Sequence, residues 1–272
     1  MLGSSRSSFE QARSALAERA RQASQSGFDS LGAELLAVSG LLAGSHQLRA
    51  ALADSGSPAE NRRAVVERLL AGQVSEPAVE VVADVAGRRW SRPRDVVDTI
   101  EGLGIEAYLI NAETSGRSDR VEDELFRAAR TVSGDEGLRS ALTDNTVNVD
   151  ARVGLIGELL QNRTAAETIE LVRHIVGNLR GRRLEEALDT LVEQAARRRE
   201  RLLAVAQVAA PITDTQYERL TAALARVYNR EIDLQVQIDP EILGGVVVTV
   251  EDEVIDGSIA HRIAQVRRSM DV

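Results

Sequence analysis

The sequence predicts a mainly helical chain in which two tandem helical bundles precede a small α+β domain. The composition supports this, because 43% of the residues are hydrophobic but only 3% are aromatic, as in bundles with aliphatic cores. A repeat at a spacing of about 90 residues runs through the helical part. Near the carboxyl end the apolar pattern changes to the two-residue period of strands.

The length of 272 residues is enough for two domains or three small ones. We expect one bundle over residues 1–104, a second over residues 105–200, and the α+β domain over residues 201–272. The third part is close to the lower size limit for independent stability.

The repeat aligns residues 28–87 with residues 118–177 without gaps. About 15 of the 60 aligned positions are identical, which is roughly twice what unrelated chains of this composition would give. Glycine ends the match in both copies, at Gly87 and Gly177. The two segments are therefore expected to fold alike.

Each copy is expected to contain the same succession of helices, with an arginine-rich turn before the last one. In the first copy these are a helix over residues 31–43, a short helix ending near Asp54, an aliphatic helix ending at Leu70, and a helix from near Pro77 to Gly87. Their counterparts in the second copy are residues 121–133, a helix ending near Asp144, one ending at Leu160, and one from near Glu167 to Gly177.

The aliphatic helix of each copy carries one apolar stripe, because its apolar residues recur at i, i+1, i+4 and i+5. The stripe consists of Val65, Val66, Leu69 and Leu70 in the first copy and of Leu155, Ile156, Leu159 and Leu160 in the second.

The joint between the copies is expected to be stiff. Residues 95–108 contain no strong helix breaker apart from Gly102 and Gly104. The last helix of the first copy is therefore predicted to run on into the first helix of the second.

The α+β part begins after a long helix that ends at the arginine run 197–201, where cations favour the negative end of the helix dipole. A strand is expected over residues 203–209. Thr213 and Gln216 have the spacing of a capping box, which predicts a helix over residues 214–228.

Residues 232–238 alternate between apolar and polar side chains, which predicts a half-buried strand. Proline ends it, because it has no N–H to donate. A valine-rich strand is expected over residues 246–250 and a tight turn at residues 251–252. Residues 254–258 are expected to open an arginine-bearing helix that closes the chain.

The residues from Leu234 to Arg268 read LQVQIDPEILGGVVVTVEDEVIDGSIAHRIAQVRR. This segment resembles the carboxyl-terminal signature of the delta subunit of F-type ATP synthases, the counterpart of the oligomycin-sensitivity-conferring protein. It departs from the family at Ala260 and His261, where a basic and a small residue are usual. The residues that carry the signature, all expected to act structurally, are Asp239, Pro240, Gly244, Gly245, Asp256, Gly257 and Ser258.

The resemblance implies that residues 105–272 form a full delta-like unit, since the family has a six-helix bundle before its signature domain. Residues 1–104 would then be an extra copy of that bundle. The implied function is that of a non-catalytic peripheral-stalk (stator) subunit. It would bind amino-terminal helices of alpha subunits and the b subunit at the cytoplasmic face of the cell membrane, so that rotor torque drives ATP synthesis.

An alternative from another class is a cytosolic helical adaptor or regulatory protein that carries a delta-like domain. Copurification separates the two hypotheses, because a stalk subunit would be recovered with alpha, beta and b subunits.

Charge and composition exclude several other classes. The net charge of −9 disfavours nucleic acid as a partner, because phosphate binding depends on basic patches. The chain has no cysteine, which excludes disulfides and thiolate metal sites. The serine-rich start lacks the apolar core of a signal peptide, and no stretch has the roughly 20 apolar residues of a membrane span. Membrane association is expected only through the complex.

No catalytic, cofactor-binding or metal-binding residue is expected. A phosphate-binding loop is impossible without lysine, which the chain lacks. His46, His174 and His261 have no metal-ligand spacing. The acidic pairs Glu185-Glu186 and Asp252-Glu253 lie in charged surroundings, where a general acid would not be desolvated.

Arginines recur at the turn before the last helix of each copy. One interpretation is helix-end capping, and the other is contact with an acidic partner surface. The candidate partner contacts are Arg88, Arg89, Arg180, Arg182 and Arg183. Trp90, the only tryptophan, is expected to be a packing residue.

Overall fold

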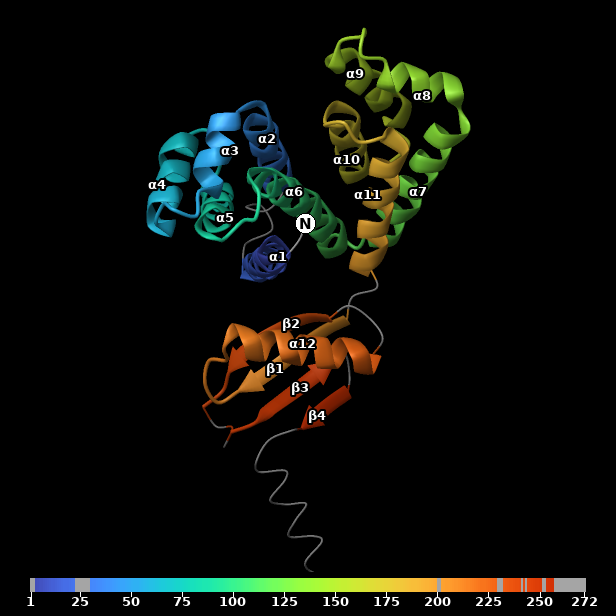
Figure 1. Cartoon of the computed structure of the whole chain (residues 1–272). Coiled ribbons are helices and arrows are strands. Elements are labelled where there is room, and N and C mark those ends of the chain that lie inside the picture. Colours follow the sequence, from blue (N-terminus) through green and yellow to red (C-terminus); the bar gives the residue numbers. More distant parts are fainter. Residues whose placement is uncertain are drawn as a thin grey trace, which may run out of the picture. The chain divides into compact units, whose positions relative to one another are not determined.

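The computed structural model describes residues 3–22, 30–199, 202–228, 232–240, 242, 244–250 and 253–256. Within these ranges the protein is mainly helical, with a small sheet near the carboxyl end (Figure 1). The chain divides into two compact units, residues 1–196 and residues 197–272. The predicted combination of helical part and small α+β part is thus confirmed.

The first unit is built from helices alone among its described residues. They are α1 (Ser4–Gln22), α2 (Leu31–Gly44), α3 (His46–Ala53), α4 (Ala59–Leu70), α5 (Glu76–Gly87), α6 (Pro93–Thr114), α7 (Ser118–Gly134), α8 (Glu136–Thr143), α9 (Val149–Leu160), α10 (Ala166–Gly177) and α11 (Leu184–Arg199). Each predicted helix is present, and the bounds of α3 to α5 differ from those of α8 to α10 by 90 residues throughout.

Helices α3 and α8, which occupy equivalent positions, begin with the same kinds of contact. Ser45 caps α3 by accepting a hydrogen bond from the Leu48 N–H at 3.3 Å, and Asp135 caps α8 by accepting from the Leu138 N–H at 2.9 Å. An arginine one turn later donates back to carbonyls at the end of the preceding helix, Arg49 in α3 and Arg139 in α8.

Helix α6 belongs to two cores. Val96, Ile100 and Leu103 pack in a core with residues of α1 to α5, while Ile105 and Leu109 pack in a core with residues of α7 to α11. Figure 1 shows α6 passing between the two groups of helices. The unbroken helix predicted over residues 95–108 is therefore confirmed, because α6 runs through them as one helix of 22 residues.

Two glycines lie inside the unbroken helix α6, and each faces a side chain of a neighbouring helix. A Cβ at Gly104 would lie 2.7 Å from Leu36 Cδ2 of α2, and a Cβ at Gly102 would lie 3.0 Å from the Phe9 ring of α1. The missing side chains let these helices approach α6 closely.

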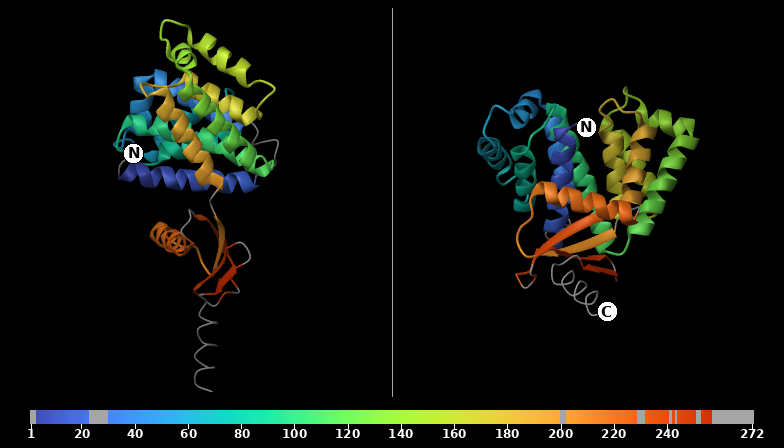
Figure 2. Two further views of the ribbon diagram at one scale, coloured as in Figure 1. Left: turned by 90° about the vertical axis from the view of Figure 1, so that its right-hand side faces the viewer. Right: turned by 60° about the horizontal axis from the view of Figure 1, so that its bottom comes forward.

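The second unit is a four-stranded sheet with one helix on it. The elements are β1 (Leu202–Val208), α12 (Asp214–Tyr228), β2 (Ile232–Ile238), β3 (Val246–Val250) and β4 (Glu253–Asp256), in the sheet order β2-β1-β3-β4. Strands β1 and β2 are parallel and are joined through α12, whereas β1 pairs with β3, and β3 with β4, in antiparallel fashion. Helix α12 covers one face of the sheet (Figure 2).

Strand β4 corrects the sequence prediction. Residues 254–258 were expected to lead directly into a helix, but Glu253–Asp256 form a strand. Val254 and Ile255 pair with Thr249 and Val248 of β3 instead. The pairing satisfies backbone groups of β3 that would otherwise form an open sheet edge. The turn expected at residues 251–252 and the helix expected from residue 258 lie outside the described residues.

The capping box of α12 is confirmed. The Thr213 N–H donates to Gln216 Oε1 at 2.8 Å, and the Gln216 N–H donates to Thr213 Oγ1 at 3.3 Å. We expect Thr213→Ala to reduce the protection of the first α12 amides by about 1 kcal/mol in hydrogen exchange. Thr221→Ala is the control, since its hydroxyl bonds only the Tyr217 carbonyl within the same helix. Equal losses in both variants would contradict the capping role.

Candidate partner-binding site

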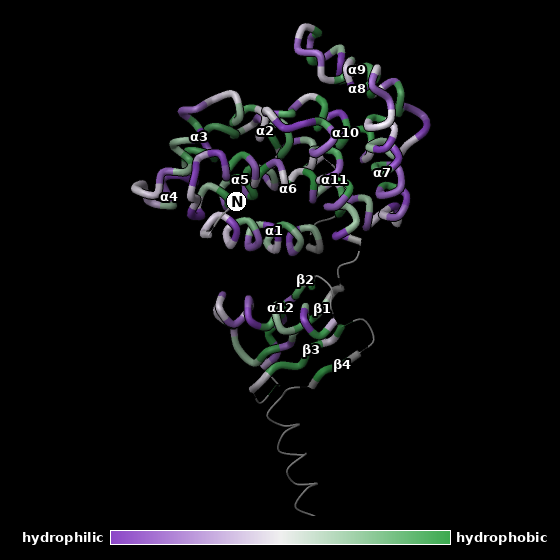
Figure 3. Tube along the Cα trace, turned by 45° about the vertical axis from the view of Figure 1, so that its right-hand side comes forward, coloured by the Kyte–Doolittle hydropathy of each residue, from purple (hydrophilic) through white to green (hydrophobic). Residues whose placement is uncertain are grey.

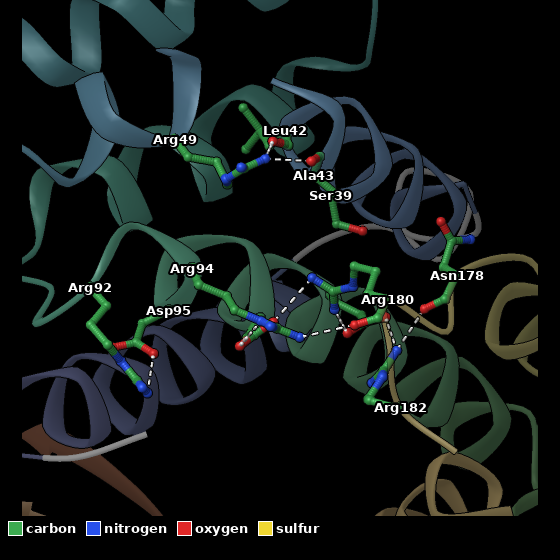
Figure 4. Close-up of polar contacts among 12 residues, drawn as sticks. Ser39, Leu42, Ala43, Arg49, Arg92, Arg94, Asp95, Asn178, Arg180 and Arg182 are labelled. Atoms are coloured by element: carbon green, nitrogen blue, oxygen red, sulfur yellow. Dashed lines mark hydrogen bonds and ion pairs between the residues drawn. The ribbon is translucent and has the colours of Figure 1, made fainter. Parts of the chain in front are cut away.

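The turn between α10 and α11 carries three of the predicted contact arginines. Arg180 and Gly181 both have positive φ, 49° and 80°, which folds the chain back before α11 begins. The Arg180 guanidinium bonds Glu101 and lies 3.1 Å from Asp98 Oδ1, both on α6. Arg182 Nη2 lies 2.9 Å from Glu101 Oε1. Figure 4 shows the Arg182 guanidinium beside Arg180, directed at the Asn178 carbonyl. This turn is therefore tied to α6 by ion pairs.

Glu101 is the centre of this cluster. Its side chain is 6% exposed, and its Oε1 lies 2.9 Å from His174 Nε2 of α10. Burial acts to raise the pKa of Glu101, but the hydrogen bond with His174 and the charges of Arg182 and Arg180 outweigh it and hold the pKa below its usual value. Glu101 is thus a buried carboxylate shared by three donors, which sequence reasoning missed.

The turn between α5 and α6 has the other two predicted arginines. Arg88 forms an ion pair with Asp84 at 2.8 Å and donates to Gln11 Oε1 of α1 at 2.7 Å. The Arg89 side chain is exposed. Trp90 is buried, and its Nε1–H donates to the Val85 carbonyl at 2.8 Å, which confirms its packing role.

The arginines therefore divide into two groups. Arg88, Arg180 and Arg182 have partners inside the first unit, and Arg182 also donates to the Asn178 and Leu179 carbonyls at the end of α10. Arg89 is exposed, and the Arg183 side chain is 72% exposed and pairs at the surface with Glu186 at 3.6 Å and Glu185 at 4.0 Å. These two arginines are the most accessible of the five to a partner.

Arg62 is a second residue that sequence reasoning did not single out. It is 5% exposed, and its guanidinium donates to the Ala86, Gly87 and Arg88 carbonyls at the end of α5 at 2.7, 3.1 and 2.9 Å. Arg62 aligns with the identical residue Arg152 in the repeat, and this match could have marked it as structurally important. Arg62 holds α4 against the end of α5.

The predicted apolar stripes are split by the structure. Val66 and Ile156 are buried, whereas Val65, Leu155 and Leu159 are 41%, 37% and 41% exposed. Each helix thus turns one edge of its stripe to the core and the other outward. Leu69 is half-buried and packs against the first core. We call the exposed residues, Val65 on α4 and Leu155 with Leu159 on α9, the outer strips.

The signature residues that the structure describes shape the second unit. The Asp239 N–H donates to the Val208 carbonyl at 2.9 Å, and the Ile242 N–H donates to the Asp239 carbonyl at 3.2 Å around Pro240. Gly244 and Gly245 have φ values of 99° and 88°, which only glycine adopts readily. Asp256 ends β4, while Gly257 and Ser258 lie outside the described residues.

One cleft of the first unit, of about 480 Å³, lies between α8 and the turn before α11, where Arg139 and Glu185 face each other at 3.3 Å. In the described part of the chain, no three histidine or acidic side chains are grouped so as to bind a metal ion. Nor does that part contain a helix with the length and apolarity to cross a bilayer.

Comparisons with known proteins find the same family that the carboxyl-terminal signature resembles. The matches extend from the second unit into the helical unit. A model of the family described as ATP synthase delta (OSCP) subunit matches residues 106–270. The ATP synthase subunit delta of Streptomyces avermitilis is 46% identical over 237 residues, with 87% of each chain covered. That of Streptomyces coelicolor is 45% identical over 241 residues, covering 89% of this chain and 88% of the relative.

Two further matches, one to a bacterial relative and one to a solved structure, differ in how strongly they support the family. The ATP synthase subunit delta of Kineococcus radiotolerans is 42% identical over 239 residues, covering 88% of this chain and 87% of the relative. A chain from the structure of a Toxoplasma gondii mitochondrial ATP synthase hexamer is 15% identical and covers 62% of this chain and 95% of that one. Its TM-score of 0.28 is too low to support any conclusion.

The bacterial alignments span so much of the chain that they include most of the residues before residue 106, where the family model begins. Most of residues 1–105 is thus shared with relatives named ATP synthase subunit delta. The resemblance found in the sequence is confirmed, and the chain belongs to the ATP synthase delta (OSCP) subunit family.

Proposed function

We propose that this chain is the peripheral-stalk subunit that links the catalytic alpha/beta hexamer of an F-type ATP synthase to the b subunits, at the cytoplasmic face of the cell membrane. The observation that carries the proposal is the family match over residues 106–270 together with relatives named ATP synthase subunit delta over nearly the whole chain. The subunit is non-catalytic. It keeps the hexamer from turning with the rotor, so that torque drives ATP synthesis.

The helical unit suits a part that bears load. Helix α6 crosses from one core to the other without a break. The ion pairs of Glu101 and Asp98 with the turn before α11 attach the second group of helices to the half of α6 that packs in the first core. Bending at this joint would break the contacts of the Glu101 carboxylate with His174, Arg180 and Arg182, which is costly.

We further propose that residues 1–104 and 105–200 are two copies of the six-helix bundle of the family, followed by the small domain at 201–272. Three observations support the duplication. The helices α3 to α5 and α8 to α10 keep a constant offset of 90 residues, and the caps Ser45 and Asp135 occupy equivalent positions. Val65 and Leu155, the exposed residues at equivalent positions of the outer strips, are also 90 residues apart.

Each outer strip is proposed to bind an amphipathic helix of a partner, the alpha subunit in the first place. On α9 the exposed aliphatic side chains at i and i+4 form a short ridge that fits between the side chains of a second helix, and Val65 exposes an aliphatic side chain at the equivalent position on α4. Because both copies expose an aliphatic side chain at this position, the extra copy would hold a second partner helix and strengthen the attachment to the hexamer.

Matched variants of the full chain test this. Val65→Asp, and Leu155→Asp with Leu159→Asp, are each expected to weaken binding to the isolated alpha/beta hexamer about tenfold or more. Arg68→Ala and Glu158→Ala, at equivalent exposed polar positions on α4 and α9, are the controls. Unchanged affinity in both the Val65 variant and the Leu155, Leu159 variant would refute binding through the strips.

Coupled ATP synthesis tests the stalk function separately. Membranes stripped of their delta subunit should regain proton-driven ATP synthesis when the wild-type chain is added. A chain that neither binds the hexamer nor restores coupling would instead favour the adaptor hypothesis.

A further inference from the structure

Helix α2 packs against the second group of helices through three residues spaced four apart, Gly32, Leu36 and Gly40. A Cβ at Gly32 would lie 2.6 Å from the Tyr108 ring of α6, and Leu36 packs in the core of the second group. A Cβ at Gly40 would lie 3.9 Å from Asn178 Oδ1, just after α10. Residues four apart form one stripe on a helix, so the second group sits on this stripe of α2.

The repeat places an equivalent stripe on α7. Residues 32, 36 and 40 align with Glu122, Phe126 and Arg130. Leu36 is only 7% exposed, whereas Phe126 is 47% exposed and Arg130 is exposed as well. Figure 1 shows α7 on the side of the second group that is turned away from α2. A stripe that is covered in the first group is therefore uncovered at two of its three positions in the second.

The two uncovered residues contact each other. Arg130 Cζ lies 5.2 Å from the centroid of the Phe126 ring, which is the geometry of a cation–π pair. Figure 3 shows that α7 is otherwise mostly hydrophilic. A half-exposed phenylalanine in such a helix leaves apolar area in water that a partner could bury. We call Phe126 with Arg130 the α7 patch.

Arg130 differs from the two other arginines of α7 in its charge partners. Arg120 pairs with Glu124 at 2.7 Å, and Arg127 pairs with Asp123. In the described part of the chain no carboxylate lies within ion-pair distance of Arg130, whose contact is the Phe126 ring. Stacking leaves the N–H groups at the edge of the guanidinium plane free to bind a carboxylate. The patch thus combines an apolar ring with a positioned cation that lacks an anion.

The covered stripe of α2 indicates what kind of partner fits the α7 patch. Helix α6 covers it and presents the small residue Gly104 to Leu36, with 2.7 Å between an added Cβ and Leu36 Cδ2. By analogy, the partner is a helix with a small residue opposite Phe126 and an aspartate or glutamate about one turn away, opposite Arg130. A second molecule of this protein does not fit, because α2 already covers that surface of its α6.

We propose that the α7 patch docks an acidic amphipathic helix of the alpha/beta hexamer, whose carboxylate pairs with Arg130. This rests on the function proposed above, in which the outer strip of α9 in the same group of helices binds the hexamer. The first group cannot make this contact, because Leu36 and Gly40 are used for packing between the two groups. The second group therefore has a partner site that its repeat lacks.

Binding of full-chain variants to the isolated alpha/beta hexamer tests the proposal. Phe126→Asp and Arg130→Ala are each expected to weaken binding roughly fivefold or more. Arg130→Glu should weaken it further, because the new charge repels the carboxylate of the partner. Arg127→Ala is the matched control, since Arg127 is exposed on the same helix but paired with Asp123, and its affinity should stay within about twofold of the wild type.

Salt dependence separates a charge contact from a general loss of structure. The affinity of the wild type should fall more steeply with ionic strength than that of Arg130→Ala, because salt screens the ion pair that the variant lacks. Circular dichroism of each variant verifies that the helices are intact.

The contradicting outcomes are distinct. If the wild type binds the hexamer and Phe126→Asp and Arg130→Ala bind it equally well, the patch is refuted while the stalk function stands. Weaker binding to the isolated b subunit alone would also overturn the proposal, because the patch would then belong to that partner. A wild-type chain that does not bind the hexamer would refute the function proposed above and the patch together.

Discussion

Glu101→Ala is expected to lower the free energy of unfolding of the helical unit by roughly 3 kcal/mol, because it leaves buried or half-buried hydrogen-bond donors without their shared acceptor. His174, Arg180 and Arg182 all contact this one carboxylate. The control is Glu170→Ala, since Glu170 pairs with Arg173 on the surface with both side chains more than 40% exposed. That variant should lose less than about 1 kcal/mol in urea unfolding.

The same carboxylate gives the stability a defined pH dependence. The pKa of Glu101 is lower in the folded protein than its ordinary value of 4.5, so the folded state favours the ionised form. The resulting stabilisation is complete above pH 4.5 and is lost as the pH falls through the lowered folded pKa. Glu101→Gln should therefore lose less stability than the wild type when the pH is taken from 5 to about 3. Parallel losses in the two proteins would show that Glu101 does not contribute.

Two glycines in helix interiors are expected to respond to alanine in opposite directions. At Gly104 of α6 a Cβ would lie 2.7 Å from Leu36 Cδ2 and 3.1 Å from the Leu36 backbone nitrogen, so α2 would have to move. We expect Gly104→Ala to destabilise by about 1–3 kcal/mol, despite the better helix propensity of alanine.

Gly154 of α9 is the matched control, because no atom lies within 4 Å of an added Cβ. Gly154→Ala should stabilise the protein by up to about 1 kcal/mol through propensity alone. Thermal and urea unfolding of the two variants measures the difference. A stabilised Gly104→Ala protein would mean that α2 and α6 are less closely packed than the structure shows.

Local signals in the sequence were sufficient for most elements. The capping box at Thr213 placed the start of α12, and the alternation over residues 232–238 gave β2 its bounds. Strand β4 was missed because Val254 and Ile255 are too few to show a period. Their conformation depends on pairing with β3, which is a tertiary contact.

The candidate site was less accessible to sequence reasoning. The arginines at the two turns could be found from the repeat, but their roles depend on acids that lie far along the chain. Glu101 is 79 residues from Arg180, and nothing local marks it as the residue that becomes buried between α6, α10 and the turn. Which arginines stay accessible follows from this packing alone.

The shared helix α6 has a consequence for how such a protein can gain or lose a bundle. Ala107 and Ile110 lie beyond residue 105, yet they pack in the core of the first group of helices. A shortened relative that began there would carry these side chains uncovered. Loss of the first group would therefore require compensating polar substitutions on one side of α6, so the two groups do not behave as interchangeable modules in evolution or in protein engineering.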